Sequence, residues 1–207
     1  TALGEKYTLL AGTSTGDNTK YQRFWAEVNY NSISKKAPID MSKRWYPCNT
    51  GGEFRKYSLN DDYVIDWEND GYRIRHHINS KGKLGSAVRN RPFYFKHGIT
   101  WNKLSSSNFG VRLVPDGYIS DDTARMIVGQ ENEMFLLLGF LCSNVCKKFL
   151  NVLSPTMSFT NSELQRLPIN FDNARVQIEL YAKKNYELSK LDRSSFETAW
   201  DFQYHPL

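Results

Sequence analysis

The spacing of apolar residues changes near residue 130, and this change limits the chain to folds with two different parts. From residue 5 to about residue 125 the apolar and aromatic runs are short and are interrupted by glycine, asparagine, aspartate and proline, as at 12–18, 49–52 and 114–117. Such punctuation predicts short strands joined by long loops. The sequence therefore favours an α+β fold, in which residues 1–130 form an irregular, twisted β-rich region and residues 131–207 form a helical support region with a C-terminal tail.

The helical region should hold two helices. Apolar residues recur at steps of three and four from Glu131 to Leu153, which predicts one amphipathic helix of about six turns. The recurring residues are Met134, Leu137, Leu138, Leu141, Val145, Phe149 and Val152. Ser154–Pro155 should end this helix, and residues 162–169 should return as a short extended segment. A second helix should run from about Asp172 to Lys190.

The net charge of +5 comes from one region of the chain. Between Met41 and Arg112 there are 13 lysines and arginines against 6 aspartates and glutamates, a balance of +7, while the remainder carries 14 against 16, a balance of −2. Within this region basic residues alternate with aromatic ones, at 43–46, 54–57, 72–75, 91–96 and 101–103. A solvated strand face would explain any one of these pairs. The concentrated surplus favours a surface for a polyanion, either duplex DNA or, as a lesser hypothesis, single-stranded RNA stacked on the aromatic rings.

Length and composition are those of a soluble globular protein. A chain of 207 residues can bury one sizeable core, and it has no run of about 18 apolar residues that could cross a membrane. We therefore expect a cytoplasmic location and no membrane partner. Cys48, Cys142 and Cys146 should be reduced core thiols, because their number is odd and no two of them have metal-site spacing. The absence of an initiator methionine and a start that resembles the middle of a domain suggest an excised fragment.

No catalytic constellation is visible in the sequence. The chain has no Pro-Pro pair, so the adenine-methylating signature of Asn or Asp followed by Pro-Pro and an aromatic residue is absent. Glycine-rich dinucleotide and nucleotide loops are absent as well. We accordingly expect no catalytic residue, cofactor or metal ion in this chain. For the densest acidic cluster, Asp61, Asp62, Asp66, Glu68 and Asp70, a solvated loop is favoured over a metal site.

Particular strings resemble the C-terminal part of large bacterial adenine-specific DNA methyltransferases. The most specific are Gly-Gly-Glu-Phe-Arg-Lys at 51–56 and Trp-Glu-Asn-Asp-Gly at 67–71, and Thr-Gly-Asp-Asn at 15–18 is less so. Further similar strings follow in the same order, at 94–101, 138–143, 151–156, 167–169 and 195–207. The most similar groups are the BREX-type phage-defence methyltransferases and the type IIG restriction-modification enzymes, whose target-recognition domain is similar to that of the TaqI-like methyltransferases.

This resemblance implies a target-recognition domain that binds double-stranded DNA. It also implies a partner, an N-terminal methyltransferase domain outside this chain, which would flip an adenine from the duplex and methylate it at N6 with S-adenosylmethionine. The recognised bases, and whether the intact enzyme also cleaves DNA, stay open. Two alternatives also stay open: a module that docks other proteins through its helices, and an RNA-binding module.

Candidate DNA contacts come from the basic stretches. For the phosphates we expect Lys43, Arg55, Lys56, Lys81, Lys83 and Lys103. For the base edges we expect residues of the 71–91 span, namely Arg73, Arg75, Arg89, Asn90 and Arg91. Thr15 and Asn18 of the glycine- and hydroxyl-rich loop, together with Arg44 and Lys96, complete the set. Tyr94 and Trp101 fit a core position as well as a base-stacking one.

Overall fold

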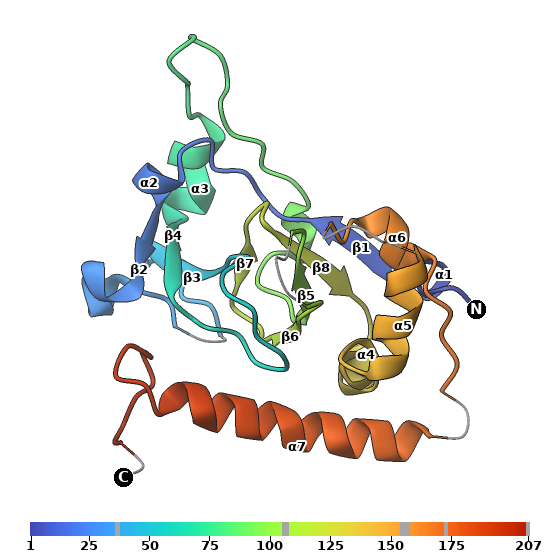
Figure 1. Cartoon of the computed structure of the whole chain (residues 1–207). Coiled ribbons are helices and arrows are strands. Elements are labelled where there is room, and N and C mark those ends of the chain that lie inside the picture. The colour runs from blue at the N-terminus through green and yellow to red at the C-terminus, as the bar shows by residue number, and fades with distance from the viewer. Residues whose placement is uncertain (36–37, 105–107, 154–157, 172–173, 206–207) are drawn as a thin grey trace.

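The fold is α+β, as the sequence predicts, and contains two four-stranded sheets (Figure 1). The computed structural model describes residues 1–35, 38–104, 108–153, 158–171 and 174–205. The first sheet has the order β1 (Thr8–Ala11), β8 (Ala124–Val128), β5 (Gly98–Asn102) and β6 (Val111–Val114). The second has the order β2 (Gln22–Phe24), β4 (Tyr63–Asp66), β3 (Trp45–Asn49) and β7 (Ile119–Ser120).

The first sheet is antiparallel throughout and supplies most of the main core. Its inner strands β5 and β8 face each other in the register Ile99 to Ile127, and both side chains are fully buried. Trp101 is also fully buried, and its indole nitrogen donates to the Phe159 carbonyl at 2.9 Å. Trp101 is therefore a core residue and has no free face on which a base could stack.

The second sheet has its own smaller core, formed by residues that include Tyr46, Ile65 and Trp67. β4 lies between β2 and β3, and β3 pairs in parallel with β7. The two sheets are joined by the buried amide of Asn49, which donates to the hydroxyl oxygens of Thr100 at 3.0 Å and Ser120 at 2.8 Å. The short helices α2 (Asn18–Tyr21) and α3 (Glu68–Arg75) lie at one end of this second sheet (Figure 1).

The predicted single helix over 131–153 is helical but is not continuous. It consists of a 3₁₀ turn (Glu131–Glu133), α4 (Met134–Leu141) and α5 (Asn144–Leu153), and the chain bends by 73° between the two α-helices. The bend has a local cause, because the Ser143 hydroxyl accepts the Cys146 amide at 3.1 Å and so caps a new helix. The Lys56 ammonium also donates to the Cys142 carbonyl, at 2.9 Å, at the end of α4.

The bend changes which face of the second helix is buried. On α5 the buried residues are Cys146 and Leu150. The predicted continuation of the apolar stripe, Val145, Phe149 and Val152, is instead 56%, 40% and 82% exposed. The predicted apolar face is therefore buried on α4 but exposed on α5. The prediction is wrong for α5 because it assumed one continuous helix where the chain forms two.

The segment over 162–169 is only partly extended. Its first part is the helix α6 (Asn161–Gln165), which begins with a capping box: the Glu163 carboxylate accepts the Thr160 amide at 2.8 Å. This motif of threonine followed three residues later by glutamate was present in the sequence and predicts a helix start. Extended pairing follows, where Pro168 forms a bridge with Ala2 beside α1 (Leu3–Lys6).

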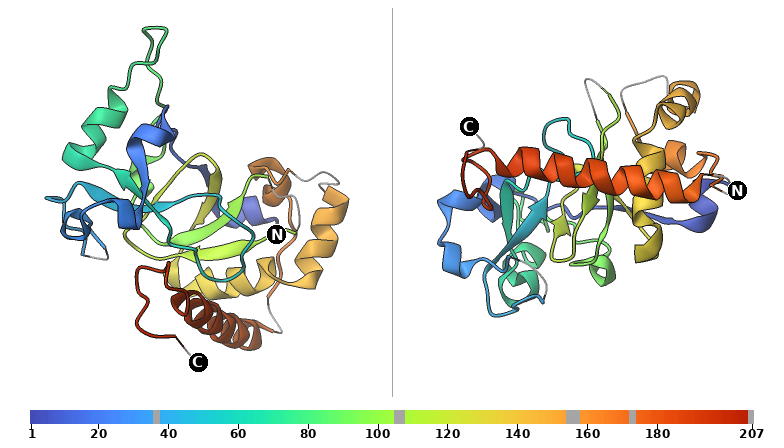
Figure 2. Two further views of the ribbon diagram at one scale, coloured as in Figure 1. Left: turned by 60° about the vertical axis from the view of Figure 1, so that its left-hand side comes forward. Right: turned by 90° about the horizontal axis from the view of Figure 1, so that it is seen from below.

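The last helix, α7 (Arg175–Ser194), is longer at its end than the predicted limit of Lys190. It lies along one side of the molecule and spans both the helical region and the second sheet (Figure 2). Gly139 of α4 permits this packing, because a Cβ built there would lie 2.6 Å from the Ile178 side chain. Beyond α7, the Trp25 indole donates to the Thr198 carbonyl at 2.9 Å and ties the tail to the β-rich region.

Several expectations depend on residues outside those described, namely the helix end at Ser154–Pro155, the helix start at Asp172 and the final Pro206–Leu207. The boundary between regions at residue 130 stays a prediction. The three cysteines are buried and free, as expected. No single helix among the described residues is long and apolar enough to cross a membrane, although the bent pair of α4 and α5 passes the same test of length and composition.

Candidate nucleic-acid interface

Lysines and arginines are concentrated at one end of the molecule, in a stretch of chain that contains no aspartate or glutamate. Residues 71–96 contain seven lysines and arginines and no aspartate or glutamate; the seven are Arg73, Arg75, Lys81, Lys83, Arg89, Arg91 and Lys96. This stretch runs from α3 through a long hairpin to the segment before β5. We call this end of the molecule, residues 71–96 with the adjoining loop 12–18, the basic end.

The hairpin of residues 77–85 projects beyond the rest of the fold at the top of Figure 1, and we call it the finger. Its two arms are joined by hydrogen bonds from Asn79 N to Lys83 O and from Gly85 N to His77 O, both 2.8 Å. The turn is closed by the Asn79 carboxamide, which accepts the amides of Lys81 and Lys83. Gly82 has a φ of 70°, a conformation that suits glycine.

The finger carries both cations and apolar groups into solvent. Lys81 and Lys83 at its tip are exposed, and within the described part of the chain neither forms an ion pair. Ile78 and Leu84 form a cross-strand bridge and are 59% and 61% exposed. This aliphatic pair was not among the residues predicted from the sequence. Its signal was an isoleucine and a leucine placed on either side of an Asn-Ser-Lys-Gly turn.

The loop of residues 12–18 supports the foot of the finger. Ser14 and Ala87 exchange two backbone hydrogen bonds of 3.0 and 2.9 Å. Gly16, with a φ of 78°, approaches so closely that a Cβ would lie 2.6 Å from the Gly85 backbone. On the other side of the foot, the Tyr21 hydroxyl and His77 Nδ1 are 3.1 Å apart.

The structure brings Thr15 and Asn18 to the basic end but gives them different surroundings. Thr15 is fully buried, and its hydroxyl lies 2.5 Å from Asn18 Oδ1, to which it donates. Asn18 is exposed at the start of α2. Thr15 is thus placed to orient Asn18, whereas only Asn18 has a side chain that a ligand can reach.

Arg89 and Asn90 follow the finger, and only the first presents its side chain to solvent. The Arg89 amide donates to the Thr13 hydroxyl at 3.2 Å, and its guanidinium is exposed without an ion pair among the described residues. Asn90 has a φ of 57°, and its amide donates to the Ala11 carbonyl at 2.9 Å. Tyr94, which shares a short hydrogen bond of 2.5 Å with Thr13, has a pKa raised by burial and belongs to this supporting network.

Four further arginines are held by two carboxylates. Asp70 pairs with Arg91 and, at 3.6 Å, with Arg75. The buried Asp66 pairs with Arg44 at 3.0 Å and with Arg73 at 2.5 Å. The side chains of these arginines keep between 31% and 46% of their surface exposed. They are fixed in direction and still able to donate outwards, which is the condition for bidentate contact with a base or a phosphate.

The acidic cluster is therefore not a solvated loop throughout. Asp66 is 1% exposed and bonded to two arginines, and Asp61 is hydrogen-bonded to Tyr118 at 2.7 Å. Within the string at 67–71, position 71 requires glycine, since its φ is 69° and a Cβ there would lie 2.5 Å from the Trp67 ring. No group of three potential metal ligands is found in the part of the chain that the structure describes.

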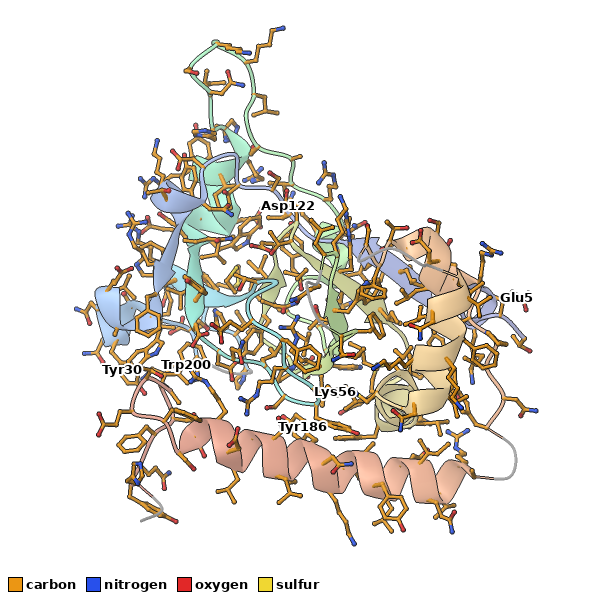
Figure 3. The ribbon with its side chains drawn as sticks, in the orientation of Figure 1. Glu5, Tyr30, Lys56, Asp122, Tyr186 and Trp200 are labelled. Atoms are coloured by element: carbon orange, nitrogen blue, oxygen red, sulfur yellow. The ribbon has the colours of Figure 1, made fainter. Side chains whose placement is uncertain are left out.

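The remaining candidates, apart from the exposed Lys96 at the last position of the basic end, lie away from that end or are used inside the fold. Arg55 donates to the Asp192 carboxylate of α7 at 2.9 Å, and Lys56 caps α4, on the side of the molecule that faces α7 (Figure 3). Lys43 pairs with Asp40 at 3.7 Å. Lys96 lies 5.8 Å from the centre of the Phe93 ring, and Lys103 is exposed at the far end of β5.

The sequence is similar to two known methyltransferases over most or all of its length. It is 36% identical over 196 residues to the adenine-specific methyltransferase PglX of Lacticaseibacillus casei (strain Zhang), and 32% identical over 211 residues to the adenine-specific methyltransferase BrxX of Escherichia coli O9:H4 (strain HS). These matches cover 92% and 100% of this chain, but the chain spans only 16% of each relative. They confirm the resemblance that the sequence strings indicate. No family model matches.

The fold is also found in a solved restriction-modification enzyme. The type IIL enzyme MmeI, whose structure was determined in complex with DNA, superposes with a TM-score of 0.59 over 95% of this chain and 29% of its own. Sequence identity between the two is 14%, so the match shows a shared fold.

Proposed function

Since this chain is homologous to a segment of the adenine-specific methyltransferases PglX and BrxX, we propose that it recognises duplex DNA for an N6-adenine methyltransferase of a restriction-modification or phage-defence system. The observation that supports this most is the basic end, with its projecting finger and its stretch of seven cations without an acid. The methyl donor, S-adenosylmethionine, and the catalytic groups would belong to another part of the enzyme.

In this proposal the finger enters a groove of the duplex. The major groove admits a two-stranded β-ribbon, and the finger is a narrow hairpin of two arms joined by one isolated bridge. Lys81, Lys83 and Arg89 would contact phosphates, because their charges are exposed and unpaired among the described residues. Ile78 and Leu84 would contact thymine methyl groups or sugars, and these contacts would explain why both side chains are exposed in the absence of DNA.

The arginines held by Asp66 and Asp70 would give the proposed site its sequence preference. Each guanidinium is oriented by a carboxylate before DNA arrives, so less side-chain freedom is lost on binding. Arg55, Lys56 and Asn90 are used in internal contacts, and we leave them out of the proposed interface.

A binding titration against salt tests this function. The affinity of the chain for random-sequence duplexes is measured by fluorescence anisotropy. If three lysines or arginines contact phosphates, this affinity should fall about 40-fold between roughly 50 and 200 mM salt. Lys81→Ala with Lys83→Ala should flatten the slope of log affinity against log salt by about two. The matched control, Lys148→Ala with Lys184→Ala, removes two exposed charges from α5 and α7 and should leave the slope unchanged. Equal effects of the two pairs would contradict the proposed interface.

A docking role for the helices is favoured by a separate observation. The outer face of α7 exposes a row of apolar side chains, Val176, Leu180, Tyr181, Leu188 and Leu191, each at least 48% accessible, and α5 exposes three more. Apolar rows of this size mark interaction surfaces. We therefore propose that these helices contact the methyltransferase domain of the enzyme while the opposite, basic end binds DNA.

Substitution of Leu180 and Leu191 by Asp tests this contact. In the intact enzyme it should reduce the rate of methylation, and in the 207-residue chain it should leave the affinity for DNA unchanged. An unchanged methylation rate would exclude the contact.

A further inference from the structure

Beside the basic end, an open groove of about 660 Å³ lies over the exposed ends of β2 and β4. This volume is within the range of about 300 to 1,000 Å³ that is typical of small-ligand sites. Its walls come from α2, from the loop after β3 at Thr50–Gly52 and from the loop after β7 at Asp121–Thr123. The DNA contacts proposed above do not use this groove.

The floor of the groove has two aromatic rings. Phe24 and Tyr63 are cross-strand partners in the β2–β4 pair, and their ring centres are 6.4 Å apart in a T-shaped arrangement. Tyr63 is 41% exposed, so its ring is open to a ligand. An exposed aromatic ring on a sheet surface is the usual platform for an unstacked base, because every base presents a π face.

The walls offer hydrogen-bonding groups of both kinds. Asn18 Oδ1 is occupied by the Thr15 hydroxyl, so its amide group points its two donors elsewhere. Gln22 Nε2 donates to Asp121 Oδ2 at 3.2 Å, which leaves Gln22 Oε1 as an acceptor. A fixed donor and a fixed acceptor next to an aromatic floor match the edge of a nucleobase.

The groove is linked to the foot of the finger through α2. Asn18 begins α2, and Tyr21, three residues later in the same helix, is hydrogen-bonded to His77 where the finger starts. A duplex held at the finger would therefore bring its nearest nucleotides to the mouth of the groove.

Two carboxylates line the groove. Asp121 is 2% exposed and engaged with Gln22 and Thr123, and the exposed Glu27 accepts the Phe24 amide at 2.9 Å. Arg23 lines the same groove and offsets part of their charge.

We propose that this groove binds a single unpaired nucleobase, stacked on Tyr63 and bonded at its edge by Asn18 and Gln22. The inference rests on the proposed DNA-binding function and adds a second subsite to it. Two sources supply such a base: a nucleotide displaced from within a duplex, or the end of a single strand.

The test compares three labelled DNAs with the 207-residue chain: a fully paired duplex, the same duplex with one bulged 2-aminopurine, and a duplex with a single-stranded 2-aminopurine overhang. The bulged duplex should bind roughly tenfold more tightly than the paired one, and stacking on Tyr63 should quench its fluorescence. Preference for the bulge over the overhang identifies a displaced nucleotide as the source, and the reverse preference identifies a strand end.

Variants assign the effect to the groove. Tyr63→Ala should remove the preference and the quenching while leaving affinity for the paired duplex unchanged, and Tyr63→Phe should keep both because the ring remains. Equal affinity for all three DNAs would overturn the groove inference and leave the DNA-binding function standing. Absence of binding to every DNA would overturn both, and an undiminished preference in Tyr63→Ala would overturn the role of the ring.

Discussion

Asp61 is a carboxylate placed where its charge destabilises the fold. It lines a cavity of about 360 Å³ between the β-rich region and α7, which is also lined by Tyr186 and Trp200 (Figure 3). Burial raises its pKa to about 6, and the nearby carboxylates of Asp201 and Asp62 act in the same direction. The Tyr118 hydroxyl donates to it at 2.7 Å, which only partly offsets the loss of solvation.

The size and sign of the effect follow from this pKa. The usual value for aspartate is 3.8, so between pH 3.8 and about 6 the folded state keeps a proton that the unfolded chain has released. The contribution of Asp61 to stability therefore falls as the pH rises through this window, and the full difference corresponds to about 3 kcal/mol. Asp61→Asn removes the charge and keeps an oxygen that accepts from Tyr118. The φ of 56° at this position is one that asparagine tolerates.

Urea unfolding followed by tryptophan fluorescence measures the consequence. At pH 7.5, Asp61→Asn should raise the free energy of unfolding by about 1 to 3 kcal/mol, whereas at pH 4 the gain should nearly vanish because the native Asp61 is then protonated. Glu197→Gln, which removes an exposed carboxylate, is the control and should change stability by less than about 0.5 kcal/mol at either pH. A gain of equal size at both pH values, or a loss at pH 7.5, would refute the argument.

Three further predictions concern the helices. Lys56→Met should lower the free energy of unfolding in urea by about 1 to 2 kcal/mol, because the Cys142 carbonyl at the end of α4 loses its donor. The DNA affinity of this variant should not change. A loss of affinity without a loss of stability would instead show that Lys56 contacts DNA. Gly139→Leu should lower the free energy of unfolding by about 1 to 3 kcal/mol and make α7 easier to cleave with protease, since the new side chain would clash with Ile178. An unchanged cleavage rate would contradict the packing of α7 on α4. Leu191→Ser should leave the free energy of unfolding within about 0.5 kcal/mol of the original, because this side chain is 63% exposed, and a larger loss in urea unfolding would show that the outer face of α7 is packed inside the chain.

The class of the fold can be predicted from the sequence, because the spacing of apolar residues along the chain distinguishes strands from helices. The sequence does not predict the bend between α4 and α5, since Met134 to Val152 fit a single helix equally well on spacing alone. The bend depends on the Ser143 cap, which can be read locally, and on Lys56, which comes from a segment 86 residues earlier.

The candidate site shows a similar division. The sequence locates the basic stretch that becomes the finger and its foot, because excess charge can be counted. It cannot separate charges that face solvent from charges used inside the fold. Arg55 and Lys56 lie in one of the most specific strings, yet their described partners are Asp192, Ser189 and Cys142. Pairing of this kind depends on tertiary contacts and has no local signal.

Lysine footprinting tests the central proposal most directly. The 207-residue chain is acetylated with and without a random-sequence duplex at about 50 mM salt, and each lysine is quantified by mass spectrometry. If the finger binds DNA, the duplex should protect Lys81 and Lys83 on the finger and leave Lys148 and Lys184 on the helices as reactive as before. Protection of the helices with an unprotected finger, or no protection anywhere, would contradict the proposal.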